Sequence, residues 1–453
     1  MKIPRIMISA ASSGSGKTLI TCGLLQALVN RGLKAGAFKC GPDYIDPMFH
    51  SKIIGAKSRN MDSYFSDENT LKYLFERTAR ECDVSVIEGV MGFYDGLSPT
   101  SDQASSYEIA KITDTPVILI VNCKGMSLSI LPTILGFLSF RSDSHIQGVI
   151  LNQISERLYG EIKRQIEEEL KIEVFGYVPY VKDLVIESRH LGLVRPEEVK
   201  DLKNRLNELA GILEQTLEID NIIKLSETAQ KLASLPPRIN KVTGKPRIAV
   251  AKDDAFCFYY EDNLTLLKDM GAELVEFSPL YDRGLPEDIQ GLILGGGYPE
   301  LWAEQLSRNH SMRESVKSFI NKGLPCIAEC GGFMYLHDSM EDMNNQKHSM
   351  VGVIHGEVYR TNRLNRFGYI ELTAMKDQLL LKNGDQIKGH EFHYFDSTSL
   401  GEALTAKKPS RPVQWNCVHG EENMEAGFPH LYYYSNTEAA YHFLLKCEKW
   451  RNK

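Results

Sequence analysis

The feature that most constrains the fold of this chain is a run of small residues near its start, between an apolar segment and a helical pattern. Residues 11–18 read ASSGSGKT and follow the apolar segment 5–10. Alanine stands at position 11, where this kind of loop usually begins with glycine. Small residues let backbone N–H groups surround phosphate oxygens at the start of a helix. The pattern therefore predicts a strand, a phosphate-binding loop and a helix.

The residues of this loop have roles that follow from their chemistry. Gly14, Ser15 and Gly16 would present backbone N–H groups to the phosphates of a nucleoside triphosphate. Lys17 would neutralise the terminal phosphates, and the hydroxyl of Thr18 would bind Mg²⁺. The sequence predicts a nucleotide site that uses Mg²⁺, with these five residues as its binding residues.

Carboxylates follow the loop at places where an open α/β sheet binds ligands, beyond the carboxyl ends of its strands. Glu88 ends an apolar segment and is the natural second ligand for magnesium, and Asp95 follows it. Asp43 and Asp46 lie in a turn stiffened by two prolines. We interpret these four side chains as candidates for binding magnesium or positioning substrate. By composition alone, the proline-containing turn is equally typical of an ordinary polar turn.

The chain, at 453 residues, is long enough for two or three domains, and its patterns divide it into two. In the first half, apolar segments alternate with helical patterns, which favours a doubly wound parallel sheet with helices on both faces. The expected strands there are 5–10, 35–40, 84–88, 117–122 and 148–152. A second α/β domain is predicted from the apolar segments 247–251, 273–277, 291–294 and 326–329. The predicted boundaries are 1–236 for the first domain, 237–246 for a linker and 247–453 for the second domain.

The second half contains a cysteine in a position typical of a catalytic nucleophile. Cys330 follows an apolar segment and precedes two glycines and a helical pattern. Such a sharp turn exposes the sulfur, and the N–H groups that follow it stabilise a thiolate or an oxyanion. Another glycine-rich segment, 295–300, would complete the oxyanion hole. We interpret Cys326, four residues earlier, as a buried structural thiol.

A cysteine nucleophile needs a base to take its proton. The downstream histidines that could serve are His355, His390, His393, His430 and His442. Residue type and position do not separate His430 from His393, so the sequence leaves this choice open.

Composition argues against several other classes of protein. The formal net charge is −7 and there is no basic stripe with interleaved aromatic residues, which argues against nucleic acid as a partner. No apolar stretch reaches the length of about 20 residues that a membrane helix needs. The nine cysteines include no CxxC pair, which predicts free thiols in the reducing cytoplasm and neither a disulfide framework nor a zinc site.

Taken together, these motifs resemble those of the cobyrinic acid a,c-diamide synthase family, and the resemblance covers nearly the whole chain. Its most specific segment is 39–50, which reads KCGPDYIDPMFH. Further matching segments are 60–64, 88–96, 188–193, 295–300, 329–332 and 389–394. The resemblance implies an N-terminal P-loop domain like that of dethiobiotin synthetase and a C-terminal class I glutamine amidotransferase domain.

The resemblance also implies a reaction. ATP would phosphorylate the a and c acetate side chains of the corrinoid tetrapyrrole cobyrinic acid. Ammonia released from glutamine would then displace phosphate and leave two amides. The implied partners are small molecules, namely ATP with Mg²⁺, glutamine and the tetrapyrrole, and a homo-oligomer is left open.

For the glutaminase site, the resemblance assigns Cys330 as nucleophile and selects His430 as its base. Many related glutaminases place a glutamate two residues after the catalytic histidine, and Tyr432 stands there in this chain. The third member of a triad is therefore open. A Cys–His dyad is one alternative, and help from His393 or Glu391 is another.

The resemblance implies further contacts in the first half of the chain. Asn152 takes the place at which related synthetases recognise the nucleotide base. Tyr44, His50, Arg189 and His190 could meet the carboxylates of the tetrapyrrole.

Two close substrates and one different class of protein compete with this interpretation. Diamidation of nickel-sirohydrochlorin or of cobalt-free hydrogenobyrinic acid would use nearly the same motifs. Cobyric acid synthases fit less well because the loop 41–50 does not resemble theirs. A nucleotide-binding scaffold without catalysis is disfavoured because such relatives usually lose the nucleophile or the loop lysine, whereas Lys17, Thr18, Cys330 and His430 are all present.

Overall fold

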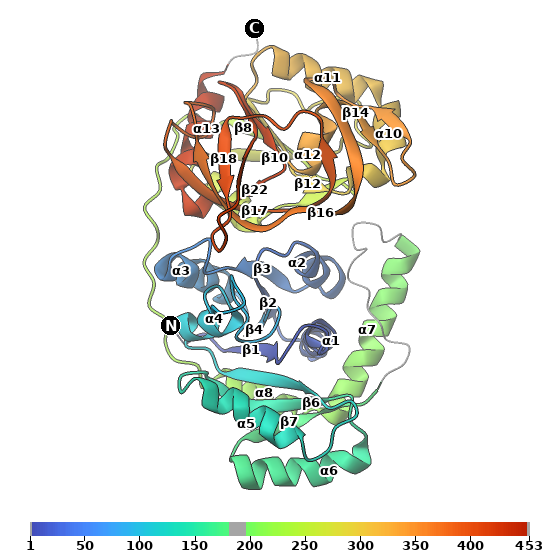
Figure 1. Ribbon diagram of the computed structural model, residues 1–453, viewed down its shortest axis with the longest axis vertical. Coiled ribbons are helices and arrows are strands. Elements are labelled where there is room, and N and C mark those ends of the chain that lie inside the picture. Colours follow the sequence, from blue (N-terminus) through green and yellow to red (C-terminus); the bar gives the residue numbers. More distant parts are fainter. Residues whose placement is uncertain (1, 181–195, 451–453) are drawn as a thin grey trace. The chain divides into compact units, whose positions relative to one another are not determined.

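The phosphate-loop pattern lies in the first of two units, Met1–Pro237, which is built on one sheet of seven parallel strands. The computed structural model describes residues 2–180 and 196–450 (Figure 1). The strand order is β3-β2-β4-β1-β5-β6-β7. The strands are β1 (Arg5–Ala10), β2 (Ala35–Cys40), β3 (Lys57–Met61), β4 (Val84–Glu88), β5 (Val117–Asn122), β6 (Ile146–Asn152) and β7 (Glu173–Val178).

All five strands predicted for this unit are present, and two more had not been predicted. The additional strands, β3 and β7, form the two edges of the sheet. An edge strand has a neighbour on one side only, and β3 (KSRNM) accordingly carries polar and partly exposed side chains. The central strand β1 is buried along its whole length, which explains why its apolar pattern is easier to recognise.

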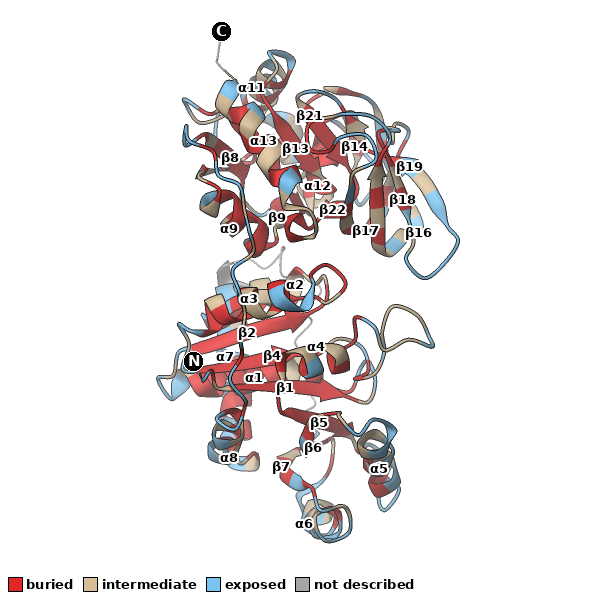
Figure 2. Cartoon of the chain, turned by 90° about the vertical axis from the view of Figure 1, so that its left-hand side faces the viewer, coloured by how far each residue is buried: buried red, intermediate tan, exposed pale blue. Residues whose placement is uncertain are grey.

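Helices cover both faces of this sheet, as the doubly wound pattern predicts. Side chains of β1 alternate between two cores: Ile6 and Ile8 pack with α1, α7 and α8, whereas Met7 packs with α3, α4, α5 and α6. The helices are α1 (Lys17–Asn30), α2 (Ile45–Phe49), α3 (Glu68–Ala79), α4 (Ser106–Thr113), α5 (Ile130–Phe140), α6 (Glu156–Gln165), α7 (Pro196–Thr216) and α8 (Ile219–Ser226). Figure 2 shows the central strands as buried between these layers.

The second unit, Arg238–Lys453, contains a six-stranded sheet in the order β10-β8-β11-β13-β21-β20. It is parallel except for β20. Its strands are β8 (Arg247–Ala251), β10 (Glu273–Phe277), β11 (Gly291–Leu294), β13 (Cys326–Glu329), β20 (His419–Gly420) and β21 (Met424–Gly427). The four strands predicted for this domain are all in this sheet, and the predicted fold class of two α/β domains is confirmed.

A second sheet in this unit had not been predicted. Its order is β15-β14-β16-β17-β22, with β18 paired to β16 and β19 paired to β18, and most of its pairs are antiparallel. Its strands are β14 (His337–Glu341), β15 (Lys347–Ser349), β16 (Ile354–Ala374), β17 (Gln386–Ser397), β18 (Leu404–Lys407), β19 (Gln414–Cys417) and β22 (His430–Leu431). The long strands β16 and β17 mix buried with exposed or half-buried side chains, so neither gives a continuous apolar run.

Shorter elements complete the second unit. The helices are α9 (Glu261–Asp269), α10 (Ala303–Arg308), α11 (His310–Asn321), α12 (Gly331–Tyr335) and α13 (Thr437–Lys449), and a short antiparallel pair is formed by β9 (Phe256–Phe258) and β12 (Gly296–Gly297). None of the helices among the described residues combines the length and the apolar character that a membrane crossing needs.

Candidate active sites in the two units

The phosphate loop connects the end of β1 to the start of α1, as its sequence predicts. Gly14 and Gly16 adopt left-handed backbone conformations, with φ of 76° and 92°, which glycine reaches without the steric cost that a Cβ brings. Ala11 has no positive φ, so the loop turns without glycine at its first position. The hydroxyl groups of Ser12 and Ser15 lie 3.1 Å apart and join the two ends of the turn.

Lys17 lies at the first position of α1, and its ammonium group is directed into the loop. Its Nζ donates hydrogen bonds to the carbonyl oxygen of Ser12, at 3.0 Å, and to that of Met91. Burial, and next the positive charge of Lys39, lower the pKa of Lys17 from 10.5 to about 8. The loop therefore holds a cation that is poorly compensated by its surroundings, which suits it to bind an anion.

Beside the loop, a buried lysine joins two carboxylates. Nζ of Lys39 lies 2.7 Å from Oε1 of Glu88 and 2.6 Å from Oδ2 of Asp46. Burial alone would lower the pKa of Lys39, but the two carboxylates outweigh it and raise that pKa well above its usual value. Burial would raise the pKa of Glu88, but Lys39 and His50 together outweigh it and lower the pKa of that carboxyl. Glu88 is therefore held as a carboxylate, with Nε2 of His50 at 3.3 Å from its Oε2.

Of the five predicted magnesium ligands, Asp46 pairs with Lys39, and the other four fall into two groups. Thr18 and Glu88 meet, since Oγ1 of Thr18 donates a hydrogen bond of 2.7 Å to Oε1 of Glu88. Asp43 and Asp95 instead accept hydrogen bonds from backbone N–H groups of their own turns, Asp43 from Ile45 at 2.8 Å and Asp95 from Gly92 at 2.8 Å. Across residues 2–180 and 196–450, no group of three or more His, Cys, Asp or Glu side chains could hold a metal ion by itself.

A nucleotide-bound Mg²⁺ does not require such a group. Mg²⁺ usually takes one or two protein ligands and completes its octahedron with phosphate oxygens and water. The hydroxyl of Thr18 next to the ionised carboxylate of Glu88 fits that requirement. The assignment of magnesium to Thr18, Glu88, Asp43, Asp46 and Asp95 stays a prediction.

Asn152 lies at the end of β6 and contacts the backbone of the phosphate loop. Its Nδ2 donates a hydrogen bond of 2.9 Å to the carbonyl oxygen of Ser15, and the side chain is buried. A Cβ at Gly16 would stand 2.4 Å from the same Nδ2, so glycine is required for this approach. Asn152 thus supports the loop, and its recognition of the nucleotide base stays a prediction.

The residues that the sequence assigned to the tetrapyrrole are only partly described. Tyr44 and His50 are both buried in the first unit, at the start of α2 and just after it. Arg189 and His190 lie outside the described residues. The predicted contacts of these four residues with substrate remain predictions.

In the second unit, Cys330 forms the sharp turn that the sequence predicts between β13 and α12. Its backbone has φ of 47° and ψ of −102°, a strained conformation for a residue with a Cβ, and strain of this kind is typical of functional turns. The turn is anchored because the N–H of Cys330 donates to the carbonyl oxygen of Gly427 at 2.8 Å. Burial, and next the charge of Glu300, raise the pKa of the thiol well above its usual value. A base is therefore needed to ionise it.

Two glycine-rich turns approach each other at the thiol. A Cβ at Gly331 would stand 2.9 Å from Cδ of Pro299 and 3.2 Å from the backbone nitrogen of Gly297. The backbones of the two turns are therefore close, an arrangement that would let their N–H groups meet one oxyanion. The oxyanion hole at these glycines stays a prediction.

His430 lies on β22 with its imidazole enclosed on several sides. The ring of His390 stacks on it at 4.9 Å between centroids, and a Cβ at Gly296 would stand 2.5 Å from its Cε1. Burial, and next the neighbouring His393, lower the pKa of His430 to about 3. The imidazole is therefore neutral, which is the form that can accept a proton.

Cys330 and His430 are linked through shared neighbours. The residue before the cysteine, Glu329, has its Oε2 at 3.9 Å from Nδ1 of His430. Gly296, which lies against His430, is followed directly by Gly297. The backbone nitrogen of Gly297 approaches Gly331, the residue after Cys330. The predicted nucleophile and base thus belong to one local arrangement.

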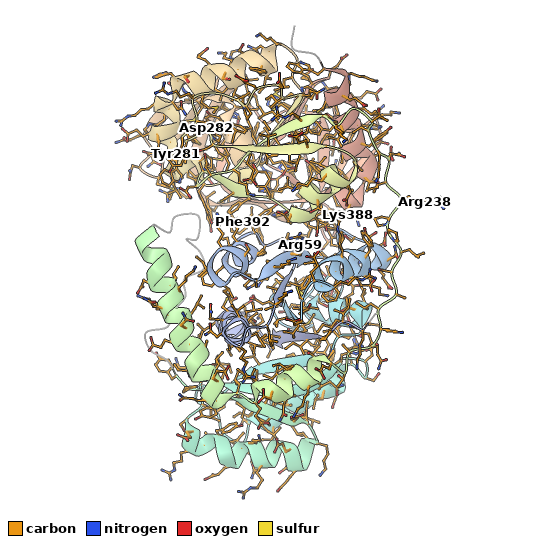
Figure 3. The ribbon with its side chains drawn as sticks, turned by 180° about the vertical axis from the view of Figure 1, so that it is seen from behind. Arg59, Arg238, Tyr281, Asp282, Lys388 and Phe392 are labelled. Atoms are coloured by element: carbon orange, nitrogen blue, oxygen red, sulfur yellow. The ribbon has the colours of Figure 1, made fainter. Side chains whose placement is uncertain are left out.

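The other candidate residues have different partners. His393 lies 2.9 Å from Oε2 of Glu391 through its Nε2, and its ring stacks on Phe428 at 4.0 Å. Oε2 of Glu391 also lies 3.5 Å from Nε of Arg366. Phe392, between the two on β17, is 49% exposed on the other face of the strand (Figure 3). Nδ1 of His442 lies 2.9 Å from the carbonyl oxygen of Leu380, and the side chain of His355 is almost fully exposed.

Sequence reasoning missed Glu329 as a neighbour of the base. The signal was present, because a carboxylate in the last position of an otherwise apolar strand, next to the nucleophile, is unusual. Its partner lies about a hundred positions later in the chain, so the pair could not be read from local spacing. Lys39 was likewise not recognised as the partner of Glu88.

Comparison with known proteins gives one family match in each of the two units. Residues 6–193 match the model of the CobQ/CobB/MinD/ParA nucleotide binding domain, and residues 247–436 match the CobB/CobQ-like glutamine amidotransferase domain. The chain is 40% identical over 450 residues to the cobyrinate a,c-diamide synthase of Caldanaerobacter subterraneus, with 99% of each chain covered. It is 41% identical to that of Listeria monocytogenes serotype 4b (98% of this chain, 100% of the relative) and 39% identical to that of Priestia megaterium (98% and 97%).

Proposed function

Because the chain belongs to the cobyrinate a,c-diamide synthase family, we propose that it converts the a and c acetate carboxylates of cobyrinate into amides, with glutamine as nitrogen donor and ATP as activator. The observation that carries this proposal is the presence of two different sites in one chain. One is a phosphate loop with Lys17, Thr18 and Glu88, and the other is a strained thiol turn beside a neutral histidine.

The chemistry of amide formation explains why two sites are needed. A carboxylate cannot expel oxide when ammonia attacks, whereas an acyl phosphate can expel phosphate. Transfer of the γ-phosphoryl group of ATP to the acetate carboxylate therefore precedes attack by ammonia. Each acetate consumes one ATP, one glutamine and one water molecule and yields one amide, ADP, phosphate and glutamate.

In the first unit, the loop residues would bind and neutralise the triphosphate. The ammonium group of Lys17 would exchange its backbone carbonyl partners for phosphate oxygens as the nucleotide binds. Thr18 and Glu88 would hold the Mg²⁺ of the nucleotide, which supplies positive charge to the phosphates when bound. Lys39 keeps Glu88 ionised and so keeps it competent for that role.

In the second unit, Cys330 and His430 would release ammonia from glutamine. The imidazole takes the thiol proton, and the sulfur attacks the carboxamide carbon to form a tetrahedral intermediate. The imidazolium then returns that proton to the leaving nitrogen, and the C–N bond breaks to give ammonia and a thioester. Water, deprotonated by the same imidazole, hydrolyses the thioester to glutamate and restores the thiol.

Mass spectrometry of the product tests the proposal. Purified protein is incubated with ATP, Mg²⁺, glutamine and, in separate reactions, cobyrinic acid, hydrogenobyrinic acid or nickel-sirohydrochlorin. Two successive acid-to-amide mass shifts on cobyrinic acid are expected. The same shifts on only one of the other two rings would keep the mechanism but contradict the substrate, and no shift on any ring would contradict the proposed function.

A further inference from the structure

The carboxyl group of Glu329 lies close to β22, the strand that carries His430. It is near both the backbone of that strand and the ring of His430. Its Oε1 accepts a hydrogen bond of 3.2 Å from the N–H of Leu431, and its Oε2 lies 3.9 Å from Nδ1 of His430. The first contact fixes the carboxyl group relative to β22. The second places it near Nδ1 of the ring, beyond hydrogen-bond distance.

Neighbouring residues hold the imidazole of His430 close to the carboxyl group of Glu329. β17 pairs with β22 at His390 and His430, and the two rings stack with an angle of 17° between their planes. The side chain of Asn263 makes two hydrogen bonds to the backbone of Leu431–Tyr433. Its Nδ2 donates to the carbonyl oxygen of Leu431 at 2.8 Å, and its Oδ1 accepts from the N–H of Tyr433 at 2.9 Å. The ring and the carboxyl group therefore keep their relative positions.

We propose that Glu329 is the acidic residue that positions the catalytic histidine, taking the place that related glutaminases give to a glutamate two residues after it. The inference rests on the proposed glutaminase roles of Cys330 and His430. The carboxylate of Glu329 holds the N–H of the imidazole on Nδ1. That choice of tautomer leaves the lone pair on Nε2 to take the thiol proton, and the same carboxylate stabilises the imidazolium that forms.

A second buried carboxyl group, that of Glu425, lies near Glu329 and competes with it for a negative charge. In the pairing of β13 with β21, Ile327 lies beside Glu425 and Glu329 beside Gly427, so the two glutamates share one face of the sheet. Burial raises the pKa of both carboxyls to about 8, and Glu329 adds to that effect on Glu425. Both carboxyls therefore resist ionisation near neutral pH, and a charge forms only where contacts stabilise it.

The contacts of the two carboxyl groups differ. Neither oxygen of Glu425 has a hydrogen-bond partner among the described residues. Glu329 accepts a hydrogen bond from the N–H of Leu431, which favours its ionised form, and it lies where it would stabilise the charge of His430 once that ring takes a proton. The contacts therefore favour a charge on Glu329 over one on Glu425. Tyr259 and Tyr433 also lie close enough to act electrostatically, and burial raises the pKa of both phenols, so they stay neutral.

Glu391, another acid near the site, is already compensated. Glu391 lies 2.9 Å from Nε2 of His393 and 3.5 Å from Nε of Arg366. Its charge is therefore balanced within β16 and β17. Tyr432, which stands at the position of the usual glutamate, packs its ring against Tyr260 at 5.2 Å and offers no carboxylate.

The experiment compares Glu329→Gln with the matched control Glu425→Gln, in the full-length chain supplied with ATP, Mg²⁺ and cobyrinic acid. Both changes replace a buried carboxyl by an amide of the same shape, and only the first removes the acid beside His430. Glutamate release is expected to show a kcat lower on the order of 100-fold in Glu329→Gln, with KM for glutamine within about threefold, because general-base catalysis commonly contributes about 10²–10⁴. Glu425→Gln is expected to keep kcat within about threefold.

A chemical readout separates positioning from damage to the fold. The rate at which iodoacetamide alkylates Cys330, followed on the cysteine peptide by mass spectrometry, reports how readily the thiol ionises. This rate is expected to fall in Glu329→Gln and to remain unchanged in Glu425→Gln. Synthesis with ammonium salts, which bypasses the thiol, reports that each variant is folded.

The outcomes discriminate between the inference and the function on which it rests. A Glu329→Gln variant that keeps its glutaminase kcat would overturn the inference, as would equal losses in the two glutamine variants. In either of those cases, loss of glutaminase activity in Cys330→Ala would leave the proposed function standing. Retention of glutaminase activity in Cys330→Ala would instead contradict the proposed function itself.

Discussion

The two candidate sites both lie at the carboxyl ends of buried parallel strands, yet they manage charge in opposite ways. In the first unit, Lys39 pairs with Glu88 and Asp46, and the charges of Lys39 and Glu88 act on Lys17, so that opposite charges are held in one place. In the second unit, burial keeps the thiol of Cys330 protonated and the ring of His430 neutral. The first arrangement suits binding of a polyanion, and the second suits transfer of a single proton.

This difference teaches how each site would fail. A site that binds phosphates depends on the number of its positive charges, so loss of a lysine weakens binding and chemistry together. A site that transfers a proton depends on which group holds it, so a change of one atom can stop the chemistry and leave binding intact. The four predictions that follow test this contrast, from the largest expected effect to the smallest.

Replacement of the nucleophile should have the largest effect, and on one nitrogen source only. Cys330→Ala removes the atom that attacks glutamine, and losses on the order of 10⁶ are known where a covalent nucleophile is removed. Glutamine-dependent synthesis should therefore vanish, while synthesis with ammonium salts continues. Amide product is measured by mass spectrometry with each nitrogen source. Equal loss with both sources in a folded protein would contradict the division into two sites.

Removal of the loop lysine should abolish synthesis with both nitrogen sources. Lys17→Ala deletes the cation that would neutralise the terminal phosphates, and comparable cations contribute on the order of 10³ or more to phosphoryl transfer. Product formation is measured with glutamine and with ammonium, at saturating ATP. Synthesis that persists at more than about a tenth of the native rate would contradict the assignment of this loop.

The sequence predicted the parts of both sites that are local in the chain. The phosphate loop and the turn at Cys330 each lie within about eight consecutive residues, and the glycines and the nucleophile identify them. The central strands were also predictable, because strands buried on both faces are apolar throughout.

What the sequence did not reveal depends on residues that are distant in the chain. The pairing of Lys39 with Glu88 requires β2 to lie beside β4, and the contact between Glu329 and β22 joins residues more than a hundred positions apart. The sheet that contains β16 and β17 escaped prediction for a different reason, since its strands are half-exposed and lack the apolar runs of buried strands. Such contacts are selected by packing, which local patterns do not encode.

The affinity for ATP should fall as the pH rises through about 8. The lowered pKa of Lys17 means that its amine is charged below that pH and loses its proton above it in the free protein. Because the phosphates require the charged form, the dissociation constant should rise by up to about tenfold per pH unit above about pH 8. Isothermal titration with ATP between about pH 7 and pH 9 measures this change. A constant affinity over that range would show that the amine of Lys17 stays charged.

The smallest effect is expected from the residue that supports the loop. Asn152→Ala removes the hydrogen bond to the carbonyl oxygen of Ser15, and a bond of this kind is worth about 1 kcal/mol, or about fivefold in affinity. Asn122 is the matched control, since it occupies the paired position on β5 but accepts its hydrogen bond, at 3.1 Å, from the N–H of Lys124 in its own turn.

Comparison of two nucleotides shows whether Asn152 acts through the loop or on the base. A residue that only supports the phosphate loop changes the affinity for every nucleoside triphosphate alike, because all share the phosphates that the loop binds. Asn152→Ala should therefore weaken ATP and GTP by the same factor, and Asn122→Ala should weaken neither. A loss of affinity for ATP alone would instead show that Asn152 recognises the base. The first unit would then bind its ligand through base recognition as well as through charge.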